Sequence, residues 1–413
     1  MTAAAPLLSV ADALAKVLAS APEPLASEIV ALAAAPGRTL AEPLKAKRTQ
    51  PPFAASAMDG YAVRAGDLAK VPATLRLVGT SAAGHGYRGR LDAGETVRIF
   101  TGAPLPDGAD SVVIQEDVEA EGSVIAFREP ASHGRHVRPA GLDFRADDLL
   151  LAAGTRLGPR QLALAAAANH AHVPVVKKPR VAILATGDEL VSPGEQPGPD
   201  QIVASNSFAI AAFVAASGGE PVDLGIAQDT FAALEAGIER ARAARADVLV
   251  TLGGASVGDH DLVHSALRRE GMELGFWKIA MRPGKPMMHG RLGAMRILGL
   301  PGNPVSSIVC GVLFLLPLVR ALLGDPAAAA DPTEPALLGI DLPANDGRQD
   351  YVRSSLLRPT RDGLPVVTPL PTQDSSMLRL LSEAECLLIR PTRASAAAAG
   401  DPCRIIRFDR IGM

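Results

Sequence analysis

The chain has 413 residues, 48% of them hydrophobic and 21% charged, so it can form several domains with packed cores, and extensive disorder is excluded. The formal net charge of −3, from 41 basic and 44 acidic side chains, excludes a global basic surface for nucleic acid. The three cysteines, Cys310, Cys386 and Cys403, lack the spacing of a zinc site or a redox pair, which favours a reducing compartment.

No membrane or export segment is expected. The first residues carry neither a basic region nor a long apolar stretch, so we predict no secretion signal. The longest apolar run, residues 308–319, contains Gly311 and Pro317 and is shorter than the about 20 residues of a membrane-spanning helix. We therefore expect a buried helix there, in a cytoplasmic protein that binds neither membranes nor nucleic acid.

The first third of the chain predicts one helix and then a small all-β module. Residues 10–19 have helical spacing of apolar side chains, with Ser9 as a plausible N-cap. From about residue 51 to 140, short β-rich runs alternate with Gly, Pro and Asp turns. The predicted strands are residues 74–78, 96–100, 111–114 and 124–127.

The middle of the chain predicts an α/β domain. After an Ala/Leu-rich helix that follows Gly158-Pro159, strands alternate with helices, which implies parallel pairing and a doubly wound α/β domain over residues 178–324. Its predicted strands are 181–186, 221–226, 247–252 and 296–300, and its helices are 206–217, 230–245, 261–270 and 306–323. Four further strands, 351–357, 364–369, 386–389 and 404–408, predict a β tail domain.

Three predicted strands of the α/β domain end in glycine-rich turns. In open parallel sheets, ligands bind beyond the carboxyl ends of the strands. Glycines let a ligand approach the backbone, and N–H groups at the start of the helix near Ser306 suit phosphate or molybdate. The turns are Thr186-Gly187-Asp188-Glu189-Leu190, residues 252–261 with Gly253, Gly254, Ser256 and Gly258, and Leu300-Pro301-Gly302-Asn303-Pro304.

Charged side chains accompany these turns. Asp188, Glu189 and Asp261 are expected to face one cleft, where carboxylates beside a phosphate site hold Mg²⁺ or position water. Residues 277–286 place Lys278, Arg282 and Lys285 around a Pro-Gly turn, which suits an anion with several oxygens.

Each motif also has a purely structural interpretation. A glycine-rich turn can be only a tight turn, and Asp188 with Glu189 can cap a helix and complement its dipole. Lys278, Arg282 and Lys285 can be the solvated face of a hairpin.

The same motifs resemble the molybdopterin molybdenumtransferase family. Similar segments are Ser56-Ala57-Met58-Asp59-Gly60-Tyr61-Ala62-Val63, Thr101-Gly102-Ala103-Pro104-Leu105-Pro106, the turns after residues 186, 252 and 300, and residues 282–286. They occur in order over nearly the whole chain, and their combination is highly specific.

The resemblance implies a four-part protomer and an elongated homodimer. The α/β domain, similar to molybdopterin adenylyltransferases, would comprise residues 1–26 with 177–325. A discontinuous linker domain would comprise 27–49 with 141–176, a small β domain 50–140, and a C-terminal β-barrel 326–413. The cleft of one subunit would be completed by the partner's small β domain.

The resemblance also implies the roles of individual residues. Insertion of molybdate into adenylylated molybdopterin, with release of AMP, would use Mg²⁺ at Asp188 and Asp261. Catalytic positions would be Asp59, Thr101, Asp143, Asp188, Glu189, Asp229 and Asp261. Substrate-binding positions would be Gly187, Gly253, Gly254, Ser256, Gly258, Lys278, Arg282, Lys285, Pro301, Gly302, Asn303, Pro304, Ser306, Arg353 and Ser375.

Two positions depart from the family pattern. The family often has Lys where Arg282 stands, and Arg presents a planar fork instead of a point donor. The family's Asp-Ser-Asn appears here as Ala204-Ser205-Asn206, so one carboxylate is missing. Both departures affect the expected ligand geometry.

Two other functions compete with this hypothesis. One is the adenylyltransferase that acts one step earlier, although such chains generally lack the module with Asp59 and Thr101 and the β tail. The other is a non-enzymatic, gephyrin-like scaffold, although this chain has no long disordered linker. Contacts with other molybdenum-cofactor proteins and apo-molybdoenzymes would also be expected of a family member.

Overall fold

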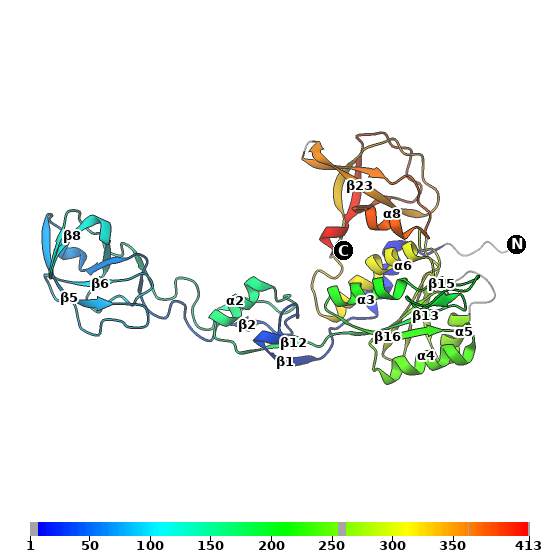
Figure 1. Ribbon diagram of the computed structural model, residues 1–413, viewed down its shortest axis with the longest axis horizontal. Coiled ribbons are helices and arrows are strands. Elements are labelled where there is room, and N and C mark those ends of the chain that lie inside the picture. The colour runs from blue at the N-terminus through cyan, green and yellow to red at the C-terminus, as the bar shows by residue number, and fades with distance from the viewer. Residues whose placement is uncertain (1–6, 255–261, 362, 412–413) are drawn as a thin grey trace.

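The protein is elongated, with a small β module at one end and an α/β unit carrying a second β sheet at the other (Figure 1). The computed structural model describes residues 7–254, 262–361 and 363–411. Ser256, Gly258 and Asp261, which the sequence places in the cleft, lie outside these ranges.

The far β module is a mixed six-stranded sheet in the order β7-β4-β6-β5-β9-β8. Neighbours pair antiparallel except β5 and β6, which are parallel. Apolar side chains pack on both faces of the sheet, in two separate clusters. The bounds are β4 Gly60–Val63, β5 Ala73–Ser81, β6 Glu95–Ile99, β7 Ser111–Ile114, β8 Val118–Glu121 and β9 Val124–Phe127.

The connecting region is built from two separate parts of the sequence (Figure 1). Strands β1 and β12 pair antiparallel, as do β2 and β11. Leu40, Leu157 and Val173 are fully buried together, so the two parts share one core. The bounds are β1 Ser27–Ala31, η1 Leu32–Ala34, β2 Leu44–Lys45, β11 Leu149–Leu151, α2 Pro159–Ala167 and β12 His172–Val176. Strands β3 Ala55–Ser56 and β10 Val137–Arg138 pair antiparallel, and the short helices η2 Ala65–Leu68 and η3 Gln115–Asp117 lie between strands of the far β module.

The α/β unit is a six-stranded sheet in the order β16-β13-β17-β21-β20-β18. Four strands are parallel, as the alternating pattern predicts. The last two strands in this order, β20 and the edge strand β18, pair antiparallel with their neighbours, which the sequence did not predict. The bounds are β13 Arg180–Thr186, β16 Glu220–Ala227, β17 Val248–Leu252, β18 Glu273–Trp277, β20 Met288–Leu292 and β21 Met295–Leu300.

Helices cover both faces of this sheet. One face packs against α1, α3 and the long helix of residues 304–322, and the other against α4 and α5. Helix α1 begins where the sequence predicts, because the Ser9 hydroxyl accepts a hydrogen bond from the amide of Asp12 at 3.1 Å. The bounds are α1 Val10–Ala19, α3 Asn206–Ala216, α4 Phe231–Ala243 and α5 Leu262–Arg269.

The long apolar helix is a core helix. It runs as α6 (Pro304–Cys310), a π-helical segment (Gly311–Leu315) and α7 (Leu316–Leu322). The wider turn precedes Pro317, which has no N–H to donate to the preceding turn. By length and composition this helix could cross a membrane, but 78% of its most apolar window is buried inside the protein.

The C-terminal sheet closes on itself. Its order is β19-β23-β24-β22-β26-β25, and β23 also pairs with β25, which produces the predicted small barrel. Its first strand, β19, comes from the α/β unit. The bounds are β19 Met281–Arg282, β22 Glu334–Leu338, β23 Gln349–Arg361, β24 Leu364–Pro369, α8 Leu378–Glu383, β25 Cys386–Arg390, β26 Pro402–Arg407 and η5 Phe408–Arg410.

Candidate functional site

The carboxyl ends of β13, β17 and β21 open onto one cavity of about 660 Å³. These three strands are neighbours in the sheet, so the turns that follow them lie side by side. Of the residues named from the sequence, the cavity is lined by Gly187, Glu189, Asp229, Gly253, Gly254, Pro301, Gly302, Asn303 and Pro304.

The two positions that follow β17, Gly253 and Gly254, admit only glycine without strain, because of their backbone angles and their close neighbours. Gly253 and Gly254 have φ angles of +102° and +63°. A Cβ on Gly253 would lie 2.5 Å from the carbonyl oxygen of Thr186, and one on Gly254 would lie 2.2 Å from a methyl carbon of Val263. The glycines therefore let neighbouring strand ends approach closely, and their backbone also forms the cavity wall.

Two carboxylates, Glu189 and Asp229, line the cavity, and Asp188 lies next to Asp229 without lining it in the described part of the chain. The Asp188 carboxylate accepts a hydrogen bond from the Asp229 amide at 3.0 Å. Partial burial, followed by the negative charges of Asp188 and Glu189, raises the pKa of Asp229. The helix-cap interpretation of Asp188 and Glu189 is wrong, because the next residues form strand β14 (Leu190–Val191), which pairs with β15 (Ile202–Val203).

The start of the long helix also lines the cavity. Asn303 is its N-cap, and Pro304 is at its first turn. The Asn206 side chain donates to the carbonyl oxygen of Gly302 at 2.7 Å, which holds the turn against the start of α3. Ser306 is only 5% exposed. Pro304 has no N–H, and the amides of Val305 and Ser307 already donate to the carbonyl oxygens of Ser375 and Asn303. The Ser306 amide is therefore the donor of this first turn that suits an oxyanion.

The C-terminal barrel contributes to the same cavity. The Asn303 side chain donates to the Ser375 hydroxyl at 2.9 Å, and the Val305 amide donates to the Ser375 carbonyl at 3.0 Å. Ser376 and Leu378 also line the cavity. Sequence reasoning quoted Asn206 within a family motif but gave it no role, and it missed Ser376 and Leu378, since no local pattern marks a residue whose role depends on a distant segment.

Arg353 lies beneath the loop of residues 372–377, which contains Ser375 and Ser376, and it does not line the cavity. Its side chain is fully buried, with 1% exposure. It donates to the carbonyl oxygens of Met377 at 3.0 Å, Thr372 at 3.2 Å and Asp374 at 2.8 Å. Burial lowers the pKa of its guanidinium, which is surrounded mainly by these carbonyls.

The basic segment approaches the cavity only through Pro286. The Lys278 ammonium lies 5.0 Å from the centre of the Trp277 ring. The Ile279 amide donates to the carbonyl oxygen of Lys285 at 3.0 Å, so the segment folds back on itself. Neither Lys278, Arg282 nor Lys285 lines the cavity in the described part of the chain.

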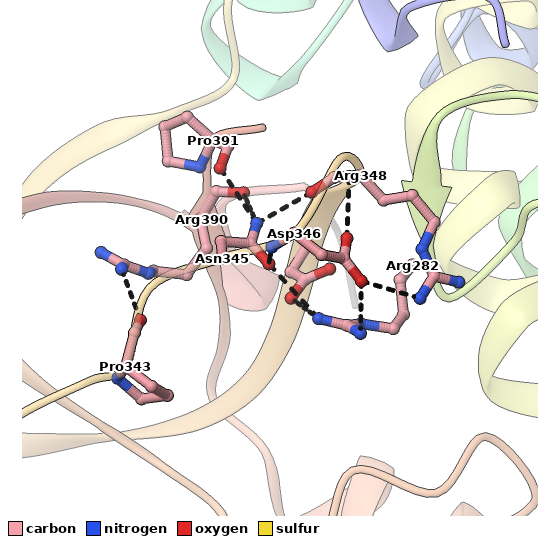
Figure 2. Close-up of polar contacts among 8 residues, drawn as sticks. Arg282, Pro343, Asn345, Asp346, Arg348, Arg390 and Pro391 are labelled. Carbon is pink, nitrogen blue, oxygen red and sulfur yellow. Dashed lines mark hydrogen bonds and ion pairs between the residues drawn. The ribbon is translucent and has the colours of Figure 1, made fainter. Parts of the chain in front are cut away.

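The Arg282 guanidinium points instead toward the C-terminal barrel (Figure 2). It is hydrogen-bonded to Asp350, to Asp346 at 3.2 Å and to the Asn345 side chain at 3.3 Å. The hydrogen bond to Asp350 raises the pKa of Arg282. Arg282 therefore pairs with two carboxylates of the barrel, while its side chain stays 47% exposed, as the solvated-hairpin interpretation expects.

Asp59, Thr101 and Asp143 lie apart from this cavity in the protomer. Asp59 immediately precedes β4 in the far β module (Figure 1). Its carboxylate accepts hydrogen bonds from the Thr101 amide at 2.7 Å and hydroxyl at 2.8 Å. Asp143 lines a second cavity of about 520 Å³, together with Arg48, Phe53, Gly102, Arg138 and others.

The main cavity therefore combines exposed backbone, a helix start and carboxylates. The first two bind oxyanions, and carboxylates hold divalent cations or activate water. The arrangement suits a phosphate-bearing substrate and a second oxyanion held side by side.

Three family models match the chain in order. They are the MoeA N-terminal region (domain I and II) over residues 8–169, a probable molybdopterin binding domain over 182–321, and the MoeA C-terminal region (domain IV) over 335–408.

Whole-chain relatives agree with these matches. A molybdopterin molybdenumtransferase of Haemophilus influenzae is 33% identical over 98% of this chain and 100% of its own length. One from a Nostoc species is 39% identical over 80% of this chain and 77% of its own. The crystal structure of a molybdopterin biosynthesis MoeA protein from Pyrococcus horikoshii superposes with a TM-score of 0.82 at 30% identity, covering 98% and 99% of the two chains.

Proposed function

The chain belongs to the molybdopterin molybdenumtransferase family, enzymes of molybdenum cofactor biosynthesis, and we propose that its main cavity inserts molybdate into adenylylated molybdopterin with release of AMP. One observation carries the proposal. Two carboxylates, Glu189 and Asp229, and the start of the long helix, each suited to one of the two reacting groups, line a single cavity. Holding both reactants there makes their encounter effectively intramolecular.

The proposed roles divide between the carboxylates and the helix start. Asp188, Glu189 and Asp229 would act on the adenylyl phosphoanhydride as it is cleaved. Molybdate would bind at residues 301–304 and Ser306, beside the backbone of Gly187, Gly253 and Gly254. Lys278 and Lys285, on the nearby turn of residues 277–286, would offset the remaining negative charge of the bound substrates. Ser375 would complete the pterin side.

We propose Mg²⁺ as the metal. No group of three or more metal-ligating side chains occurs within the described residues. Mg²⁺, however, is usually held by one or two carboxylates together with substrate phosphates and water. The raised pKa of Asp229 reflects, after burial, crowding by Asp188 and Glu189, which a divalent cation would relieve. Asp188, with Asp261, would therefore hold the ion, which neutralises phosphoanhydride charge when bound.

We propose that the working unit is a homodimer, with the four-domain division of the protomer that the family resemblance implies. The far module exposes apolar side chains near Asp59 and Thr101, and the rim of the main cavity exposes others. Such surfaces usually mark an interface. Near Asp59 they are Phe53, Met58, Phe100 and Leu142, with 43%, 41%, 39% and 60% exposure; at the rim they are Ile202, Val203 and Leu378, with 59%, 42% and 37%.

The test is AMP release from adenylylated molybdopterin by the purified protein, with and without molybdate and Mg²⁺. We expect release to require both. ATP consumption that leaves the pterin adenylylated would instead support an adenylyltransferase. No turnover, with tight capture of a receptor peptide, would support a scaffold. We expect activity in the cytoplasm, with apo-molybdoenzymes or other cofactor proteins as recipients.

A further inference from the structure

Arg282 joins the α/β unit to the C-terminal barrel. Its guanidinium contacts Asp350 and Asp346, which both belong to the barrel (Figure 2). Arg348 donates to the same Asp346 carboxylate at 3.0 Å. The Asn345 side chain donates to the carbonyl oxygens of Arg348, Arg390 and Pro391, so the segment that receives Arg282 is itself firmly held.

The backbone makes the same connection. Strand β19, which contains Arg282, pairs in parallel with the start of β23, with Arg282 opposite Asp350. The Gln349 amide donates to the carbonyl oxygen of Ala280 at 2.9 Å. The ion pair between Arg282 and Asp350 therefore lies beside a short stretch of β-sheet pairing that joins the α/β unit to the barrel.

Strand β23 continues from this junction to the cavity. Three positions beyond Asp350 it carries Arg353, whose guanidinium binds three carbonyl oxygens of the loop at residues 372–377. Ser375 of that loop is bonded to Asn303 and Val305 at the helix start. A continuous series of contacts thus runs from Arg282 along β23 to the cavity wall.

We propose that Arg282 is a positioning residue, which clamps Asp350 and Asp346 and thereby holds β23 and Ser375 in place at the cavity, and that it does not bind the oxyanion itself. This inference rests on the proposed function.

The charges support the clamp. Asp350 is 8% exposed, and Arg282 is the cation that pairs with it among the described residues. If Arg282 turned toward an oxyanion, it would leave a buried carboxylate without its counter-charge, which is costly. Asp350 Oδ1 already has no hydrogen-bond partner in the described part of the chain. The planar fork of arginine reaches three acceptors here, whereas lysine would offer a point charge.

A double-mutant cycle on the full-length protein separates the two roles. The variants are Arg282→Gln, Asp350→Asn and the pair, with the charge-reversed pair Arg282→Asp/Asp350→Arg as a rescue. The measurements are kcat and KM for molybdate in AMP release, and hydrogen exchange at the Gln349 amide. Arg404→Gln is the matched control, because Arg404 pairs with Asp331 at 2.9 Å inside the same barrel without contacting the α/β unit.

If Arg282 acts as a clamp, the two single variants should have the same effects. Arg282→Gln and Asp350→Asn should each lower kcat by roughly tenfold, leave KM for molybdate within about twofold, and speed exchange at Gln349. The double variant should be no worse than either single variant. The charge-reversed pair should recover part of kcat, and Arg404→Gln should resemble the wild type.

A different pattern would overturn the inference. If Arg282 binds the oxyanion, Arg282→Gln raises KM for molybdate while Asp350→Asn does not, and the charge-reversed pair stays inactive. Unchanged exchange at Gln349 in both single variants would equally exclude the clamp. Wild-type activity is measured in the same series, so failure of the proposed function would be seen separately, as no AMP release from the wild type.

Discussion

The carboxylate of Asp59 accepts two hydrogen bonds from Thr101, one from its amide and one from its hydroxyl, across 42 positions of sequence. The hydrogen bond from the Thr101 amide, then that from its hydroxyl, and finally the charge of Arg98 lower the pKa of Asp59 below its ordinary value. Desolvation opposes them and is too small to cancel them. The pair is exposed at the end of the molecule that lies away from the main cavity, so the carboxylate is held charged and oriented toward solvent or a partner.

Thr101→Val tests this orientation. It removes the hydroxyl donor and keeps the amide, so the pKa of Asp59 should rise toward its ordinary value. Because the folded pKa is lowered, this contribution to stability is present above the unfolded pKa and is lost as pH falls through the folded pKa. NMR titration of the Asp59 carboxyl measures the change. Thr74→Val, at an exposed position of the same sheet, should leave the titration unaltered.

Mixed dimers test whether two subunits share a cleft. Asp59→Asn and Asp188→Asn should each be inactive alone, because every cleft in such dimers lacks one carboxylate. Random 1:1 mixing should restore about a quarter of wild-type AMP release, since half the dimers are mixed and each has one intact cleft. Absence of recovery, once subunit exchange is demonstrated, would contradict a cleft shared between two subunits.

Asp188→Asn tests the carboxylate cluster. Adenylylated molybdopterin should still bind, while AMP release falls by at least about 100-fold. The pKa of Asp229 should also fall, because the variant removes a neighbouring negative charge that helps to raise it. Glu121→Gln, an exposed position on the far module, is the control. Unchanged turnover in Asp188→Asn would remove this residue from the reaction.

Gly253→Ala should be far more damaging than Gly302→Ala. The alanine at 253 combines a φ of +102° with a 2.5 Å approach to the Thr186 carbonyl oxygen, whereas the nearest atom to a Cβ at 302 lies at 3.6 Å. We expect a loss in the free energy of unfolding of about 3 kcal/mol at 253 and less than about 1 kcal/mol at 302. Thermal and urea unfolding measure both; equal losses would contradict the close approach of the two strand ends.

Arg353→Met tests the support beneath the cavity loop. It removes a buried guanidinium that donates to three carbonyl oxygens, so the free energy of unfolding should fall by about 3 kcal/mol, and amides of residues 372–377 should exchange faster. Arg379→Met is the control, because the side chain of Arg379 is 90% exposed. Loss of molybdate affinity with normal loop exchange would instead make Arg353 a ligand.

Much of the fold was predictable because local patterns and tertiary packing agree. The predicted segments 10–19, 111–114, 124–127 and 364–369 coincide with α1, β7, β9 and β24. Strands β18 and β20 were not predictable, since Gly275 and Gly290 interrupt their apolar patterns. A Cβ on Gly290 would lie 2.7 Å from the Glu273 carbonyl oxygen, so close pairing of the strands selects glycine there.

The candidate site was predictable only in part. Glycine-rich turns indicate where the strands end, and parallel pairing places these carboxyl ends side by side at one edge of the sheet. The surroundings of Arg282 could not be predicted, because its partners Asp346 and Asp350 lie 64 and 68 positions away. The burial of Arg353 and the contact of Ser375 with the helix start likewise depend on how the barrel docks. The roles assigned to individual residues and the domain division stay predictions.

The most direct test of molybdate insertion measures AMP and product in the same sample. Purified protein is supplied with adenylylated molybdopterin, molybdate and Mg²⁺; AMP is quantified, and the released product is offered to an apo-molybdoenzyme. We predict that active molybdoenzyme forms in proportion to AMP. AMP release without activation of the apo-enzyme, or activation without AMP release, would contradict the account.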